Sequence, residues 1–124
     1  MNFNKKASIK SNTRAHDLVA KKYESLHIEI YNDIEQNRLK NALERALTYV
    51  ETNSSINKAL DFGCGAGNLT THLTTIGCEV ISCDVSQGFL DLINSGSYNT
   101  KVKTVLLNGK DLSGVPDNSV DLVA

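Results

Sequence analysis

The stretch Leu60-Asp-Phe-Gly-Cys-Gly-Ala-Gly67 places three alternate glycines between a short apolar run and a helical one. Glycine adopts backbone conformations that other residues avoid, so Gly63 allows a sharp exit from a strand and Gly65 lets a ligand lie against bare backbone. Gly67 permits a close approach where the next helix begins. The pattern predicts a strand, a ligand-binding turn and a helix, in that order.

The second half of the chain alternates short apolar runs with helical windows. Runs that suit strands lie at 58–62, 79–85, 101–107 and 120–124, and helical windows lie at 68–76 and 86–95. Right-handed crossovers then predict an α/β fold, a Rossmann-like parallel sheet with helices on both faces. Ligands of such sheets bind at the carboxyl ends of the strands, so we expect the site in the turns that follow them.

The first half is expected to be helical after a flexible start. Apolar residues at intervals of three and four predict two helices, one over about 13–30 and one that ends near 53–55. The first 14 residues contain four Lys or Arg and no acid, which is typical of a solvated tail. The expected organisation is a flexible tail over 1–12 and a partial domain over 13–124, made of a helical cap (13–55) and a βαβαβ core (56–124).

Charge and cysteine content narrow the class of protein. Thirteen Lys plus Arg against fourteen Asp plus Glu leave a net charge of -1, so the sequence shows no general signature of nucleic-acid or membrane binding. We therefore expect a small-molecule partner, no nucleic acid and no membrane. Three cysteines without a CxxC pair favour neither a disulfide framework nor a zinc site, and the expected location is the cytoplasm.

The spacing of the glycines bears on which nucleotide would bind. A dinucleotide fingerprint is GxGxxG, whereas the glycines here follow GxGxG, with Asn68 at the position of the last expected glycine. Asp61, two positions before the first glycine, would repel a pyrophosphate but would attract an ammonium group. The turn favours a nucleoside that carries an amino acid over a dinucleotide.

The next two turns supply further polar groups. Asp84 follows Gly67 by seventeen residues, at the end of the second predicted strand. A carboxylate there can accept hydrogen bonds from both hydroxyls of a ribose, which suits either class of nucleotide. In the third turn, Asn108 and Gly109 combine an amide side chain with flexible backbone that could read the edge of an adenine.

Three motifs in this order resemble the amino-terminal part of a class I S-adenosylmethionine-dependent methyltransferase, of the type grouped with small-molecule methyltransferases. The motifs are the segments 59–67, 83–86 and 112–123. The resemblance implies S-adenosylmethionine as the cofactor and an unidentified small-molecule methyl acceptor. It also implies more strands than four, so we expect a sheet truncated after the fourth strand and little turnover from this chain alone.

The resemblance also implies roles for individual residues. Asp61 and the backbone of Gly63 would hold the methionine amino group, and Asp84 would hold the ribose. Val85 and Phe89 would flank the adenine. The cofactor-binding residues implied are Asp61, Gly63, Cys64, Gly65, Asp84, Val85, Phe89, Asn108 and Gly109.

Some positions keep a structural alternative. Phe89 also fits the buried stripe of its helix, and the three cysteines also fit small buried core residues. Tyr23 could cover the site as an amino-terminal lid, although its place on an apolar stripe favours core packing. The three histidines share no metal-ligand spacing, so no metal site is predicted, and no catalytic base can be assigned. Two other functions stay open, a non-catalytic interaction module with the same fold and a nicotinamide-dependent oxidoreductase.

Overall fold

The computed structural model describes residues 2–19, 29–50, 58–98 and 100–124. Its strands are β1 (Lys58–Phe62), β2 (Glu79–Asp84), β3 (Val102–Leu106) and β4 (Leu122–Val123). Its helices are α1 (Asn2–Val19), α3 (Asp33–Val50), α4 (Asn68–Thr75) and α5 (Gln87–Asn94). Every predicted strand and the helices of the second half are therefore present, with ends shifted by a few residues.

The strands form one parallel sheet in the order β3-β2-β1-β4, and this confirms the predicted Rossmann-like α/β fold. Strand β1 lies between two neighbours, and its residues Ala59, Leu60 and Asp61 are at most 3% exposed. Asp121 attaches β4 to β1, because its carboxylate accepts from the Lys58 N–H at 3.0 Å. Since the strands are parallel, the turns after β1, β2 and β3 meet at one edge.

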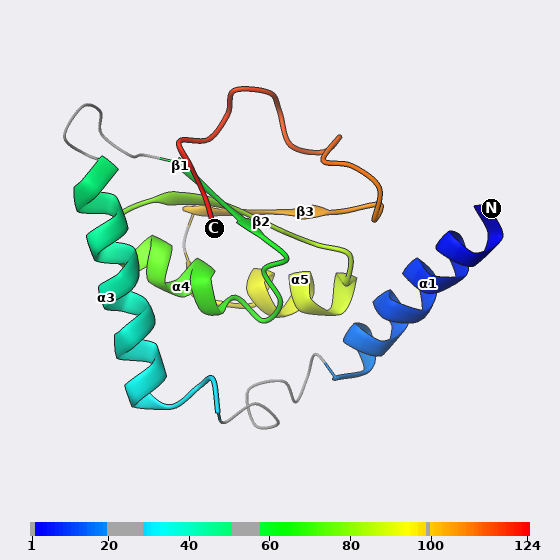
Figure 1. The fold of residues 1–124 in the computed structure, drawn as a ribbon, viewed down its shortest axis with the longest axis horizontal. Coiled ribbons are helices and arrows are strands. Elements are labelled where there is room, and N and C mark those ends of the chain that lie inside the picture. The colour runs from blue at the N-terminus through cyan, green and yellow to red at the C-terminus, as the bar shows by residue number, and fades with distance from the viewer. Residues whose placement is uncertain (1, 20–28, 51–57, 99) are drawn as a thin grey trace.

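The prediction that helices cover both faces of the sheet is wrong for the part of the chain that the structure describes. Figure 1 shows α3, α4 and α5 on the same side of the sheet, with the irregular segment 107–121 on the other side. The chain moves in one direction from β1 to β2 to β3, and successive right-handed crossovers in one direction place their helices on one face. Strand β4 lies beyond β1, but the connection to it contains no helix.

Two groups of buried side chains hold the helices to the sheet. One contains Leu47 of α3, Leu73 of α4 and Ala59 and Val80 of the sheet. The other contains Cys64 of the glycine turn with Leu90 and Ile93 of α5. Helix α3 thus shares a core with the sheet, and the glycine turn is itself part of the packed interior.

The amino-terminal segment differs from the expected flexible tail. Helix α1 covers Asn2–Val19, so the tail predicted over 1–12 is wrong, as is a helix start at 13. The absence of acids does not prevent a helix, because lysine, alanine and arginine all favour one. Tertiary contact adds to this, since Ile9 Cγ2 lies 2.9 Å from the position that a Cβ would take on Gly109. Residues 20–28 of the predicted first helix lie outside the described part of the chain.

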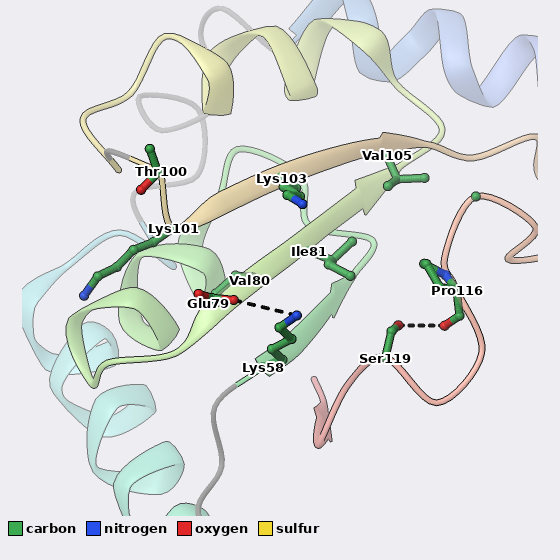
Figure 2. Close-up of a pocket in the computed structure, with 11 residues that line it drawn as sticks. Lys58, Glu79, Val80, Ile81, Thr100, Lys101, Lys103, Val105, Pro116 and Ser119 are labelled. Carbon is green, nitrogen blue, oxygen red and sulfur yellow. Dashed lines mark hydrogen bonds and ion pairs between the residues drawn. The ribbon is translucent and has the colours of Figure 1, made fainter.

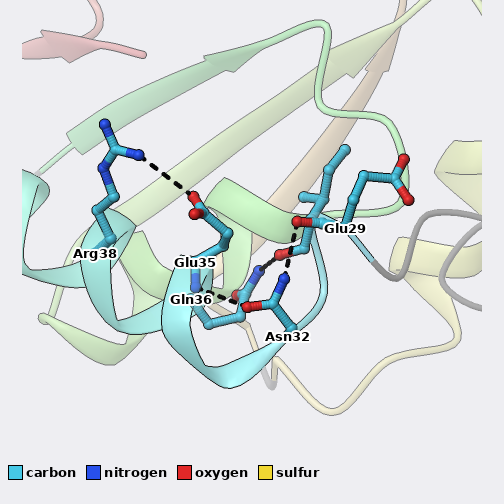
Figure 3. A network of polar contacts seen from close by, with 6 residues as sticks. Glu29, Asn32, Glu35, Gln36 and Arg38 are labelled. Carbon is cyan, nitrogen blue, oxygen red and sulfur yellow. Dashed lines mark hydrogen bonds and ion pairs between the residues drawn. The ribbon is translucent and has the colours of Figure 1, made fainter.

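The start of α3 is fixed by a polar network that Figure 3 shows. The Glu35 N–H donates to Asn32 Oδ1 at 3.0 Å, and Asn32 Nδ2 donates to the Glu29 carbonyl at 2.9 Å. Gln36 Nε2 donates to the Ile30 carbonyl at 2.9 Å. These bonds cap the helix and tie the preceding turn to its first residues. The turn is thereby held in one conformation beside the sheet.

We expect Leu73→Ala to lower the free energy of unfolding by about 2–5 kcal/mol, because Leu73 is fully buried between α4 and the sheet and the truncation leaves a cavity. Leu106→Ala is the matched control, because Leu106 is 55% exposed on β3 and should change stability by less than about 0.5 kcal/mol. Urea unfolding followed by circular dichroism measures both. Equal losses for the two variants would contradict the described core.

Candidate functional site

The glycine turn after β1 folds back over the end of β2. The N–H groups of Gly63 and Cys64 both donate to the Cys83 carbonyl, at 2.9 and 3.0 Å. Gly65 follows with a left-handed φ of 50°, a conformation that costs a residue with a Cβ roughly 1–2 kcal/mol. The turn therefore lies directly beside the end of β2, as the sequence predicts.

Gly67 serves the packing of the turn. Its φ is 91°, and a Cβ there would stand 3.1 Å from Ile93 Cγ1 and 3.2 Å from the Tyr98 hydroxyl. The Tyr98 hydroxyl also lies 2.8 Å from Thr71 Oγ1 of α4. Gly67 thus permits α4 to begin in contact with α5 and the segment after it, which is the close approach expected at the third glycine.

Asp84 joins the first turn to the second. Its Oδ2 accepts from the Gly65 N–H at 3.0 Å, and its Oδ1 accepts from the Ser86 N–H at 2.9 Å. The residue is 8% exposed, so its carboxylate is largely fixed in place. A carboxylate has about four lone-pair sites, which leaves two for further donors such as ribose hydroxyls.

Asp61 is a buried acid at the base of the same turn. It is 1% exposed, and its Oδ2 accepts from Thr70 Oγ1 at 2.6 Å. Burial raises the pKa of the Asp61 carboxyl above its usual value; the hydrogen bond from Thr70 opposes that rise, and the Asp84 charge adds to it. Among the described residues, no Lys or Arg forms an ion pair with Asp61. A ligand with an ammonium group would supply the missing positive charge.

A cavity of about 180 Å³ adjoins Asp61. Residues 63–66 of the glycine turn line it, together with the first residues of α4. Ile30 and Tyr31, from the turn before α3, complete its wall. A cation bound here would contact the carboxylate of Asp61 and bare backbone at once.

Ile30 and Tyr31 were missed by the sequence reasoning, which selected Tyr23 as a possible lid. Tyr23 lies outside the described residues, so its role stays a prediction. A usable signal was Asn32 followed by Glu35, the spacing of a capped helix start. That signal fixes where α3 begins, and therefore which residues precede it.

The third turn is closed on itself. Asn108 Oδ1 accepts from the N–H groups of Lys110 and Asp111, at 2.8 and 3.1 Å. Its Nδ2 donates to Asp111 Oδ1 at 3.0 Å. Both lone pairs of the amide oxygen are thus occupied, and an adenine amino group could bind it only if this turn opened. The turn still adjoins the site, because the Leu107 N–H donates to the Asp84 carbonyl at 2.8 Å.

The remaining predicted residues differ in exposure. Val85 is half-buried beside Asp84, whereas Phe89 is 1% exposed and lies in the core, as its structural alternative proposed. Cys64 is also buried, and burial raises the pKa of its thiol, with the charges of Asp61 and Asp84 adding to the effect. The thiol is therefore uncharged at neutral pH. Gly109 has a φ of 76° and is covered by Ile9 of α1.

Histidines and acids do not gather into a metal site in the described residues. His72 instead connects two helices, because its Nε2 lies 2.8 Å from Gln36 Oε1 of α3. Burial lowers the pKa of His72, and Lys40 adds to this effect. His72 is thus a neutral packing residue at neutral pH.

A second, larger cavity of about 420 Å³ lies on the face of the sheet opposite α3, α4 and α5 (Figure 1). Figure 2 shows Ile81, Lys103 and Val105 of the sheet facing Pro116 and Ser119 of the segment 107–121. It contains none of the predicted site residues. The candidate site is therefore the smaller cavity at the carboxyl edge.

Comparison with known proteins identifies the class of this arrangement. The profile of the family described as "Methyltransferase domain" matches residues 60–124, which contain the glycine turn, Asp84 and the fourth strand. The chain therefore belongs to the methyltransferase domain family, and its resemblance to class I S-adenosylmethionine-dependent methyltransferases is confirmed. S-adenosylmethionine, the predicted cofactor, is the methyl donor of this family.

Three individual proteins show the range of the similarity. Ribosomal RNA small subunit methyltransferase C of Idiomarina loihiensis is 34% identical over 62 residues, which are 50% of this chain and 18% of that protein. A candidate RNA methyltransferase from Pyrococcus horikoshii is 25% identical with a TM-score of 0.53, over 70% of this chain and 43% of the other. The plantazolicin methyltransferase BamL is 16% identical with a TM-score of 0.60, over 94% and 47%, and shares the fold. The chain spans less than half the length of each.

From the net charge we expected that the protein has no nucleic-acid partner. That expectation is wrong. Two of the similar proteins just described are named for RNA methylation. Net charge averages over the whole chain, whereas phosphate contacts depend on local groups of basic residues. Here the first 14 residues hold four basic residues and no acid, within a chain whose net charge is -1.

In the residues that the structure describes, no helix combines the length and the apolar character needed to cross a membrane.

We expect Gly67→Ala to destabilise the protein more than Gly77→Ala. Both glycines have left-handed φ values, 91° and 101°, so both variants carry a similar backbone cost of roughly 1–2 kcal/mol. Only at Gly67 must a new Cβ also displace Ile93 and Tyr98, because nothing lies within 4 Å at Gly77. Thermal and urea unfolding measure the difference. Equal destabilisation would show that the contact between α4 and α5 does not require this glycine.

Proposed function

We propose that this chain is the cofactor-binding part of an S-adenosylmethionine-dependent methyltransferase. The observation that carries the proposal is the placement of two buried acids, Asp61 and Asp84, at the ends of adjacent parallel strands beside one glycine turn. Residues 58–124 supply this core. The helical cap expected over 13–55 is part of the proposal; its described portions are the end of α1 and α3, and α3 packs on α4.

The proposed roles follow from the chemistry of each group. Asp61 holds the ammonium group of the methionine part of the cofactor. The backbone of Gly63, Cys64 and Gly65 lines the cavity in which this part lies. Asp84 accepts from the ribose hydroxyls while it keeps Gly65 in place. Val85, in the second turn, is proposed to flank the adenine, with Phe89 supporting that turn from the core. Asn108 and Gly109 are proposed to contact the adenine edge, in a third turn that opens to receive it.

The cofactor supplies a methyl group bound to a sulfonium, and the residues described here orient it. Correct orientation of a donor and an acceptor can lower a barrier by about 7–11 kcal/mol. A base is required only if the acceptor must lose a proton. No base is assigned among the described residues, so the acceptor side of the site is proposed to involve other parts of the protein.

Asp61 favours this cofactor over a nicotinamide dinucleotide. A buried carboxylate at the base of the turn would repel a pyrophosphate, and it would attract an ammonium group. The interaction-module alternative has no need of two buried acids, each of which costs free energy to bury. These acids therefore support a binding function for the turn.

The small-molecule acceptor expected from the sequence stays a proposal, as does the cytoplasmic location. RNA is a second candidate acceptor, which α1 and the similar RNA methyltransferases favour. Lys6, Lys10 and Arg14 are exposed on α1 at intervals of four residues, so they share one helix face. Among the described residues, no acid forms an ion pair with them.

We expect the folded chain to bind S-adenosylhomocysteine but not NAD, and Asp84→Ala to weaken that binding at least tenfold. The loss follows from removing charged acceptors for the ribose hydroxyls, each worth roughly 1.5–3 kcal/mol. Isothermal titration calorimetry measures the affinities, and circular dichroism checks the fold. Asp91→Ala, an exposed acid on α5, is the matched control. Unchanged affinity in Asp84→Ala would refute the assigned site, and binding of neither ligand would favour the interaction-module alternative.

If RNA is the acceptor, we expect replacement of Lys6, Lys10 and Arg14 by Gln to weaken binding of single-stranded RNA and to make it less dependent on salt. Loss of three phosphate contacts should reduce the slope of log affinity against log salt by about 2. Fluorescence anisotropy at several salt concentrations measures the slope. The control replaces Arg38, Lys40 and Arg45 of α3 by Gln. An unchanged slope in the α1 variant would show that this helix does not contact the RNA.

A further inference from the structure

Behind the candidate site, three buried polar side chains from three elements form a continuous chain. Asp61 lies on β1, Thr70 on α4 and Ser82 on β2, and each is at most 1% exposed. Thr70 Oγ1 lies 2.6 Å from Asp61 Oδ2 and 2.6 Å from Ser82 Oγ. The register of the sheet contributes to this arrangement, because Asp61 and Ser82 are direct neighbours across β1 and β2.

The hydrogen bonds of this chain have one direction when Asp61 is ionised. A carboxylate can only accept, so the single hydroxyl proton of Thr70 points to Asp61. The bond between Thr70 and Ser82 must then use the Ser82 proton, with Ser82 as donor. Both protons therefore point toward the carboxylate, and bonds aligned in this way strengthen one another.

The position of Thr70 indicates that this hydrogen-bonded row of side chains, Asp61, Thr70 and Ser82, has a function. Thr70 faces the sheet beside the fully buried Leu73 of the same helix, where an apolar side chain would pack without polar cost. Buried polar groups at core positions are expected chiefly where function requires them. Here the polar chain ends on the acid that adjoins the cavity of the candidate site.

Groups around Asp61 oppose its ionisation unless hydrogen bonds compensate. Asp84 on β2 is the charged group nearby, and the thiols of Cys64 in the turn and Cys83 on β2 are uncharged neighbours. No basic side chain among the described residues pairs with Asp61. Within the described part of the chain, Thr70 is the side chain that donates a hydrogen bond to the Asp61 carboxylate.

We propose that Thr70, supported by Ser82, is a positioning residue that keeps Asp61 ionised and aimed at the ammonium group of the bound ligand, and so sets the lowest pH at which that ligand binds. The proposal rests on the function proposed above. Thr70 touches Asp61 and not the cavity, because it is not among the residues that line it. It therefore acts on the ligand only through Asp61.

The sign of the pH effect follows from this role. The ammonium group keeps its charge in acid, whereas Asp61 loses its charge as the pH falls through its pKa, so affinity is high above that pKa and falls below it. Removing the hydrogen bond from the Thr70 hydroxyl favours the protonated carboxyl. The loss of affinity then begins at a higher pH.

The first test compares wild type, Thr70→Val and Thr70→Ser in titrations with S-adenosylhomocysteine from acid to neutral pH. Thr70→Val keeps the size of the side chain. We expect this variant to begin losing affinity at a higher pH than wild type does, and to bind about tenfold more weakly in the pH range where affinity is falling. Thr70→Ser should restore the wild-type profile. Thr75→Val is the control on α4, because Thr75 is exposed and bonds to the Thr71 carbonyl. A profile for Thr70→Val equal to that of wild type would overturn the proposal.

A second ligand shows whether the effect depends on the ammonium group. 5′-Methylthioadenosine carries the nucleoside without the amino acid, so we expect Thr70→Val to leave its affinity unchanged at every pH. Equal weakening of both ligands would mean that the substitution disturbs the whole site, and this would also overturn the proposal.

A measurement without ligand separates this inference from the proposed function. Carbon-13 NMR of the side-chain carboxyls, with Asp61→Asn used for assignment, follows the ionisation of Asp61 directly. We expect the Asp61 titration to move to higher pH in Thr70→Val, and less far in Ser82→Ala, even if the protein binds no S-adenosylhomocysteine. An unmoved titration in both variants would refute the role of Thr70 and Ser82 whatever the ligand.

Discussion

The parallel pairing of β1 with β2 determines where the site residues lie. Direct register places Asp61 beside Ser82 and brings the glycine turn against the end of β2, where two of its N–H groups donate to Cys83. Asp84 then adds a carboxylate bridge to Gly65. A slip of one residue in this register would turn Asp61 to the opposite face of the sheet and separate it from α4. The site is thus a consequence of strand register more than of any single side chain.

Two acids within this edge have different environments. Asp84 accepts from the backbone N–H groups of Gly65 and Ser86, whereas the Asp61 carboxylate accepts from the hydroxyl and the backbone of Thr70 alone among the described residues and is desolvated. Burial of a charge is unfavourable unless it is compensated by hydrogen bonds or by an opposite charge. The difference suits two kinds of ligand group: hydroxyls can add to the free lone pairs of Asp84, and a cation relieves the desolvation of Asp61. The proposed assignment of ribose and ammonium follows this chemistry.

Errors in the sequence-based predictions have identifiable physical causes. Helices were expected on both faces, but strand order decides this, and order is set by pairing between segments far apart in sequence. The tail over 1–12 forms α1, which contacts Gly109 through Ile9, and such a contact leaves no periodic signal. Net charge excluded nucleic acid, although the similar proteins include RNA methyltransferases, because an average conceals a local cluster. Asn108 had a plausible side chain for a ligand, yet its oxygen is occupied within its own turn.

The sequence by itself determined the alternation of strands and helices, the glycine turn and the presence of acids after β1 and β2, because these depend on local periodicity and on the conformational freedom of glycine. It also determined the family, through the order of these motifs. Only the tertiary structure decided that Thr70 and Ser82 reach Asp61, and that Tyr31 lines the same cavity. Those relations join residues from different elements, and their distances depend on strand register and helix packing, which no local pattern encodes.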